Sequence, residues 1–282
     1  GGGINKATNG SYVIQLTGGD LHIMKGKLTC KGAGALYLSQ PEGTAMERNL
    51  TVEDGAIIDA SGHSEKKGYA IRSSSCASNI TINGGEFYGD TCALYTTGGS
   101  LLINGGKFEN KSAGSNWGAI DIIATSSRNM DTVSIDNAVV NNPNGYKSLY
   151  VRWSPKTGIK GGSFTSSRHA VYVGYASADD SHLTISGGTF VTTGSYPVIY
   201  ALGTSNRVDI TGGNFQRTNV SATATNMVGN NSKASFTITG GNFNRTVKGN
   251  STTAPFVPSG YDEDQSGPEG FEYHIYKVNA DE

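Results

Sequence analysis

A six-residue pattern, Ile-x-Gly-Gly-x-Phe, recurs along the chain and constrains its fold more than any other feature of the sequence. Strict copies occupy residues 82–87, 103–108, 159–164, 185–190, 210–215 and 238–243. Degenerate copies occupy residues 23–28, 52–57 and 135–139, the last of which is one residue short. Nine such units predict a repeat architecture, in which each unit packs only against its neighbours.

The length of the unit restricts the choice of architecture. With Ile57 and Val139 taken as the closing apolar residues of two degenerate units, successive units are 21 to 31 residues apart. A second apolar run follows each unit, as at 36–38 and 171–173. Leucine-rich repeats need a Leu/Asn ladder, and propeller blades need four strands in about 40 residues, so neither fits. Short strands joined by glycine corners predict an all-β fold, a parallel β-helix of about nine coils.

Alternation within the pattern predicts where each residue points. The Ile faces inward, the Gly pair bends the backbone, and the Phe re-enters the core beyond the bend. Longer inserts at 58–68, 109–118 and 216–226 are expected at one corner of the coils. The repeat fades after Phe243, so residues 1–257 are predicted to form the β-helix. Residues 258–282 are predicted to form a C-terminal cap or tail, with an alternating strand at 271–278.

Composition excludes several classes of partner. Gly accounts for 40 of 282 residues, only 7 are Pro, and the net charge is −1, so neither a collagen helix nor a nucleic-acid partner is expected. No run of 18 apolar residues occurs, so membrane insertion is not expected either. The first residue is not Met, which suggests a segment whose targeting signal has been removed. Cys30, Cys76 and Cys92 fit neither a disulfide framework nor a metal site, and are expected to be small buried thiols.

The repeat resembles a known group of folds. Ile-x-Gly-Gly-x-Phe followed by an Ala-x-Tyr-x strand, as at 35–38, 93–96 and 170–173, is similar to repeats in large cell-surface proteins of gut Firmicutes. The size of the coils resembles that of the pectate-lyase-like superfamily. This resemblance covers roughly residues 20 to 245 and implies a right-handed, single-stranded parallel β-helix. It also implies a secreted or cell-surface location, with roles that range from stalks and adhesive or carbohydrate-binding surfaces to lyases and hydrolases.

Few residues suggest catalysis. Of the acidic and His segments of polygalacturonase-like enzymes, only Asp179-Asp180 with His182 has a counterpart, and this acidic pair is expected to be a solvated loop. Lyase chemistry needs an Arg or Lys base, often with Ca²⁺ bound by several carboxylates.

The nearest candidates for such a site are Asp121, Arg152 and Lys156, with no carboxylate cluster beside them. The repeat places Asp121 and Tyr150 in one outward column on adjacent coils. An exposed Asp121–Arg152 ion pair without catalytic function is the simpler interpretation. No metal or cofactor is therefore expected.

The second strand of each unit offers a more suggestive surface. Its alternation turns Tyr37, Tyr95, Tyr150 and Tyr172 outward, and Trp153 follows the same strand. Stacked rings of this kind make a platform for sugar rings or for a partner protein. Alternatively, they only stabilise the sheet, in which Tyr is common. The nearby Arg168-His169 segment is expected to be a turn.

Two functional hypotheses follow. In the first, the chain is a non-catalytic secreted or cell-surface module for adhesion or carbohydrate recognition, whose partner is a glycan or a host or cell-surface protein. In the second, it is a polysaccharide lyase or glycoside hydrolase acting on an acidic polysaccharide near Asp121, Arg152 and Lys156.

Overall fold

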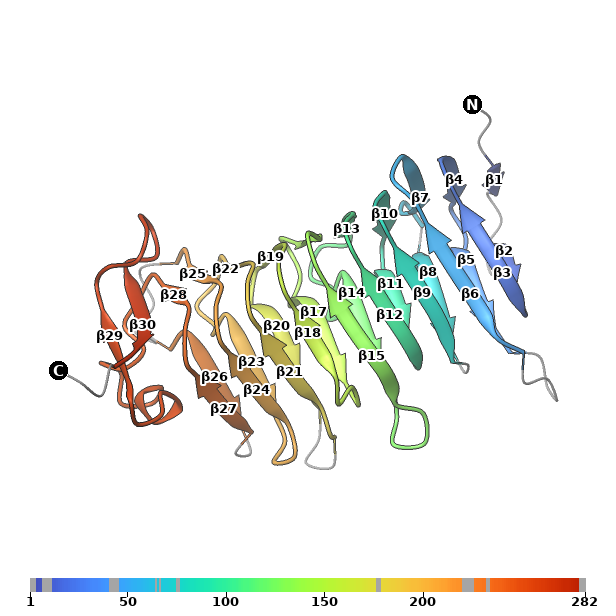
Figure 1. The fold of residues 1–282 in the computed structure, drawn as a ribbon. Helices are drawn as coiled ribbons and strands as arrows, with labels where there is room; N and C mark the ends of the chain where they lie inside the picture. Colours follow the sequence, from blue (N-terminus) through green and yellow to red (C-terminus); the bar gives the residue numbers. More distant parts are fainter. Residues whose placement is uncertain are drawn as a thin grey trace.

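The chain forms a parallel β-helix whose coils stack from the N-terminal to the C-terminal end (Figure 1). The computed structural model describes residues 4–6, 12–40, 46–63, 65, 67–74, 77–175, 179–219, 226–231 and 234–278. In this part of the chain the only helical element is one 3₁₀ turn, η1 (Ala254–Phe256). The expected all-β repeat fold is therefore confirmed.

Strands from successive coils pair into three long sheets, and each strand lies between its neighbours in the following order. Sheet A contains β1 (Ile4–Lys6), β4 (Gly26–Cys30), β7 (Ala56–Ala60), β10 (Glu86–Gly89), β13 (Lys107–Asn110), β16 (Val139–Asn142), β19 (Ser163–Ser166), β22 (Thr189–Thr192), β25 (Asn214–Arg217), β28 (Asn242–Phe243), β30 (Tyr273–Lys277) and β29 (Tyr261–Asp264). Sheet B contains β2 (Tyr12–Leu16), β5 (Gly34–Ser39), β8 (Tyr69–Ser74), β11 (Cys92–Thr96), β14 (Ile120–Ile123), β17 (Lys147–Arg152), β20 (His169–Val173), β23 (Ile199–Leu202) and β26 (Val228–Asn231). Sheet C contains β3 (Gly19–Ile23), β6 (Arg48–Val52), β9 (Ser78–Ile82), β12 (Gly99–Ile103), β15 (Met130–Ile135), β18 (Thr157–Ile159), β21 (His182–Ile185), β24 (Arg207–Ile210) and β27 (Ser235–Ile238).

Each coil runs through sheet B, then sheet C, then sheet A. The nine strands of sheet B and the nine of sheet C give nine such coils in the described chain, as the repeat predicts. The Ile of each repeat ends a sheet C strand and the Phe lies in the following sheet A strand. The glycine doublet therefore makes the corner between these two sheets.

The core is a ladder of like residues. Phe87 and Phe108 stack with ring centroids 4.7 Å apart. Phe164, Phe190, Phe215 and Phe243 form a second stack, with successive centroids 4.7–5.0 Å apart. All six rings are fully buried. Because each ring fills the space above the one below, the aromatic spacing equals the strand spacing.

The second glycine of each doublet adopts a left-handed conformation. Gly188 has φ +101°, and a Cβ there would lie 3.1 Å from the Gly162 carbonyl oxygen on the coil below. A side chain would therefore be strained by its own backbone and crowded by the next coil. The unit that lacks a doublet uses Asn137 instead, at φ 49°, and Asn tolerates this region better than most residues.

Two closing residues differ from the sequence prediction. Val140, not Val139, pairs with Phe108 and Phe164, and Val139 is 46% exposed. That unit is therefore not one residue short. Likewise Ile58, not Ile57, pairs with Leu28 and Phe87, because the preceding corner holds one extra residue.

The C-terminal end of the stack is closed by antiparallel pairing. After β28 the chain forms η1 and then β29 and β30, which lie across the last coil (Figure 1). β30 pairs antiparallel with β28 and with β29. Phe256 of η1 packs against Phe236 of the last coil, with ring centroids 5.1 Å apart. The expected strand at 271–278 is present as β30.

The longer inserts lie where predicted, at the corner between sheet A and sheet B. Residues 64, 66 and 220–225 of these inserts lie outside the described residues, as does Cys76. Cys30 and Cys92 are free and buried, as expected. None of the described helical residues forms a segment long and apolar enough to span a bilayer.

Candidate functional site

The outward face of sheet B carries one continuous column of polar and aromatic side chains. Parallel register places Gln15, Tyr37, Arg72, Tyr95, Asp121, Tyr150, Tyr172, Tyr200 and Gly229 at equivalent positions on successive strands. The four tyrosines predicted to share a column do share it. The predicted position of Asp121 beside Tyr150 is also correct.

This column is not a flat aromatic strip, as stacking alone would make it. Tyr150 is only 7% exposed, and its ring meets that of Tyr172 edge-on at 81°. Arg72 separates Tyr37 from Tyr95. The aromatic surface is therefore broken into two separate hollows, one near each end of the sheet.

The first hollow, the Arg72 pocket, has a volume of about 430 Å³. It is lined by Tyr12, Ala33, Lys67, Tyr69, Arg72, Asp90, Thr91, Ser112, Ser115 and Trp117. The Arg72 guanidinium lies 5.1 Å from the centre of the Tyr69 ring and donates a 2.8 Å hydrogen bond to the Tyr12 hydroxyl. This pocket combines aromatic faces with hydroxyl groups and with charges of both signs.

The second hollow, the Arg168 pocket, has a volume of about 400 Å³. It is lined by Tyr146, Lys147, Arg168, His169, Tyr172, Tyr196, Pro197 and Tyr200. The Arg168 guanidinium carbon lies 3.4 Å from the centre of the Tyr146 ring and 4.8 Å from that of Tyr196. Rings on both sides hold this cation in place without neutralising it.

His169 forms the floor of the Arg168 pocket. It begins β20, so the turn expected at Arg168-His169 ends one residue earlier. Burial lowers the pKa of His169 to about 4, so its ring is neutral near pH 7. The ring nitrogen Nδ1 lies 2.7 Å from the Pro197 carbonyl oxygen, which can only accept, so Nδ1 carries the proton. The other nitrogen, Nε2, is therefore a hydrogen-bond acceptor.

Lys147 lies beside this floor, one strand below His169. Its Nζ lies 4.4 Å from the centre of the Tyr150 ring and 5.3 Å from that of Tyr172. Burial lowers the pKa of Lys147, and the nearby Asp121 opposes this shift. The ammonium group is thus held against two aromatic faces in a poorly hydrated position.

Asp121 is not an exposed residue, contrary to expectation. Its side chain is fully buried, and Oδ1 accepts a 2.9 Å hydrogen bond from the Gly118 amide. No described residue hydrogen-bonds to Oδ2. Burial raises the pKa of Asp121 to about 7, although the charge of Lys147 opposes the shift. The chain just before β14 covers the carboxyl group, so an extended polysaccharide on this face does not reach it.

The predicted Asp121–Arg152 ion pair does not form. Arg152 instead pairs with Asp179, whose carboxylate is buried, so that residue does not lie in a solvated loop. Asp180 is exposed, as expected. Lys156 is exposed in the segment between β17 and β18. The structure therefore does not bring the three candidate catalytic side chains into one site.

Trp153 also differs from expectation. It adopts a left-handed backbone conformation, with φ 52°, directly after β17. Its side chain packs against the hydrophobic core and lines neither aromatic pocket. Trp153 therefore does not extend the tyrosine column. The exposed Trp of this face is Trp117, whose ring contacts Tyr95 edge-on.

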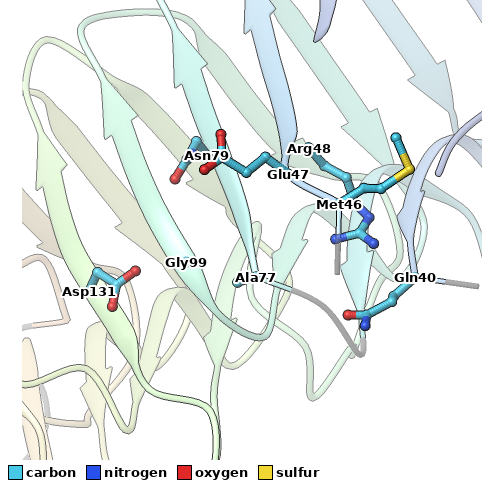
Figure 2. A pocket seen from close by; sticks show the side chains of 8 residues that line it. All are labelled: Gln40, Met46, Glu47, Arg48, Ala77, Asn79, Gly99 and Asp131. Atoms are coloured by element: carbon cyan, nitrogen blue, oxygen red, sulfur yellow. The ribbon is translucent and has the colours of Figure 1, made fainter. Parts of the chain in front are cut away.

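A third hollow lies at the starts of four sheet C strands and has a volume of about 370 Å³ (Figure 2). It is lined by Gln40, Met46, Glu47, Arg48, Ala77, Asn79, Gly99 and Asp131. The Arg48 Nε donates a 2.8 Å hydrogen bond to the Ser39 carbonyl, and Asp131 lies at the far side of the hollow (Figure 2). No aromatic side chain lines it, and it borders residues 41–45 and 75–76, which are outside the described chain.

Sequence reasoning missed most of the pocket residues. Tyr200 could have been found, because it aligns with Tyr172 in the repeat. Tyr146, Arg168 and Tyr196 precede sheet B strands at the corner from sheet A, where the repeat has no fixed pattern. Among the residues that the structure describes, no group of three His, Cys, Asp or Glu side chains could hold a metal ion.

Comparison with known proteins adds no assignment: the chain matches no family model, no curated protein and no solved structure.

Proposed function

We propose that the chain is a non-catalytic, secreted or cell-surface module that binds carbohydrate through the outward face of sheet B. The observation that carries this proposal is the Arg168 pocket, where Tyr172, Tyr196 and Tyr200 surround about 400 Å³ of open space beside hydrogen-bonding groups. Sugars present apolar C–H faces and a rim of hydroxyls. Aromatic walls with a few placed polar groups suit both features.

The spacing of the two pockets favours an extended glycan. Strand β8 passes beside the Arg72 pocket and β20 beside the Arg168 pocket, and these strands are four coils apart in sheet B. Four strand spacings amount to about 19 Å. A chain of several sugar residues lying along the stack would reach both pockets. A concave, hydroxyl-rich site also suits a glycan better than a flat protein partner.

The cellular setting belongs to this proposal. The repeat resembles those of bacterial cell-surface proteins, and the coil size resembles that of the pectate-lyase-like superfamily. An adhesive module with a glycan partner, on the cell surface or secreted, fits this resemblance and the aromatic pockets together. A host or cell-surface glycoprotein would present the same chemistry.

The enzymatic alternative, a lyase or hydrolase of acidic polysaccharides, has less support. It requires Asp121, Arg152 and Lys156 to act together. Asp121 is buried, Arg152 is paired with Asp179, and Lys156 lies in a separate segment.

Binding of wild-type protein and three variants to an oligosaccharide array tests the proposal. Tyr172→Ala and Tyr200→Ala each remove one wall of the Arg168 pocket and are expected to weaken binding at least tenfold. Tyr88→Ala is the matched control, because Tyr88 is an outward tyrosine on sheet A. Absence of binding to every glycan, or equal binding by all four proteins, contradicts the proposal. New reducing ends or unsaturated products would support the enzymatic alternative.

A further inference from the structure

The Arg168 pocket carries positive charge that the described chain does not neutralise. Arg168 makes two ring contacts, and no hydrogen bond or ion pair joins its guanidinium to a described side chain. Stacking occupies the two faces of the guanidinium plane. Its N–H groups lie in that plane, so they stay available at the edge, where a carboxylate binds in a bidentate manner.

Lys147 supplies a second cation on the same pocket wall. Its Nζ lies against the rings of Tyr150 and Tyr172 and forms no ion pair with any described carboxylate. Asp121 is close enough to influence it electrostatically, but lies buried behind the sheet B column. Two cations held by aromatic rings at one opening favour an anion there.

The other walls fit a sugar ring. The rings of Tyr172 and Tyr200 lie 5.3 Å apart and tilt by 38°, which leaves an aromatic surface beside the two cations. His169 contributes the unprotonated Nε2, which can accept a hydrogen bond from a sugar hydroxyl. The Arg168 pocket thus combines an anion site, a stacking surface and a hydroxyl acceptor.

The Arg72 pocket provides an internal contrast. Asp90 is among its lining residues, and Arg72 already donates a hydrogen bond to Tyr12. No Asp or Glu lines the Arg168 pocket. The two hollows on this face therefore differ in their preference for charge.

We infer that the Arg168 pocket binds an anionic sugar residue. Its carboxylate or sulfate group lies against Arg168 and Lys147, and its ring lies on Tyr172 and Tyr200. This inference rests on the proposed carbohydrate-binding function and names the class of sugar. The Arg72 pocket, by the same reasoning, receives a neutral part of the same chain.

Titration calorimetry with three matched ligands tests the inference. The ligands are an oligouronate, the same oligosaccharide with its carboxyl groups reduced to alcohols, and a sulfated oligosaccharide of equal length. Wild-type protein is expected to bind at least one anionic ligand about tenfold more tightly than the reduced one. This advantage is expected to shrink as salt is raised. Preference between the carboxylated and the sulfated ligand identifies which anion the pocket takes.

Two variants assign the effect to the pocket. Arg168→Gln and Lys147→Gln are each expected to remove most of the tenfold preference and to leave binding of the reduced ligand within about twofold. Lys156→Gln is the control, since Lys156 is an exposed cation outside the pocket. Using two variants keeps the test valid if one of them fails to fold.

The possible failures are distinct. Equal binding of all three ligands by the wild-type protein, or an unchanged preference in both variants, overturns the inference and leaves the proposed function standing. Absence of binding to every ligand in the series counts against this inference, and the wider array then decides whether the proposed function fails with it.

Discussion

Arg152 and Asp179 form an ion pair between adjacent coils, in which Nε lies 3.1 Å from each carboxylate oxygen. Asp179 is buried, whereas 28% of the Arg152 side chain is exposed. Arg152→Ala is therefore expected to lower the free energy of unfolding by about 1–3 kcal/mol, less than for a fully buried pair. Urea unfolding measures this change. Lys156→Ala is the control, with an expected change within about 0.5 kcal/mol. A variant that loses catalytic turnover with unchanged stability would instead favour the enzymatic alternative.

Removal of one ring from the core ladder is expected to be costly. Phe190 is stacked between Phe164 and Phe215, with centroids 5.0 Å away on both sides. Phe190→Ala is expected to lower the free energy of unfolding by about 3–5 kcal/mol, because neighbouring coils can fill the cavity only in part. The matched variant Val191→Ala removes an outward, half-buried side chain from the same strand and should cost much less. Equal losses in denaturant unfolding would show that the ladder is not the main source of stability.

The register at β16 makes a direct prediction. Val140 is buried between Phe108 and Phe164, whereas the adjacent Val139 is 46% exposed. Val140→Ala is expected to cost about 1–3 kcal/mol, and Val139→Ala less than about 0.5 kcal/mol. Comparing the two variants by thermal or urea unfolding decides between the two alignments. The reverse order of stabilities would restore Val139 as the core residue.

Asp121 and His169 are expected to give opposite dependences of stability on pH. The pKa of Asp121 rises from 3.8 to about 7 in the folded protein, so the folded state binds more protons than the unfolded state between these values. Its contribution to stability therefore falls as pH rises from about 4 to about 7. The pKa of His169 falls from 6.5 to about 4, so its contribution to stability rises with pH over about 4 to 6.5.

Each slope is expected to approach 1.4 kcal/mol per pH unit, so the two nearly cancel in the wild-type protein. Stability measured between pH 5 and 6.5 checks this balance. Relative to the wild type, Asp121→Asn should become more stable as pH rises through this range, and His169→Gln should become less stable. Parallel curves for all three proteins would mean that neither group has a shifted pKa.

The fold was predictable from the sequence because the constraint repeats. A left-handed corner with no room for a Cβ, as at Gly188, requires glycine, and the requirement recurs in six strict copies. Where the glycines are missing, as around Asn137, the predicted register is wrong by one residue. The alternation of sheet B is equally regular, which explains why the predicted tyrosine column is correct.

The candidate site was only partly predictable. Burial of Asp121 depends on the covering chain at Gly118, whose path follows no repeat. The partner of Arg152 comes from an irregular segment of the next coil rather than from an equivalent position. Ring contacts at Arg168 likewise join three successive corners. Such contacts arise from tertiary packing of irregular segments, which periodicity cannot reveal.

Tyr146, Arg168 and Tyr196 all come from the corner between sheet A and sheet B, whereas the phenylalanine ladder lies on the other side of the strands. Substitution at these corners would leave the ladder untouched, so specificity and folding can evolve almost independently in this protein. Tandem duplication of a coil together with its corner would lengthen the face by one strand spacing, about 4.8 Å, and add one more set of ligand contacts.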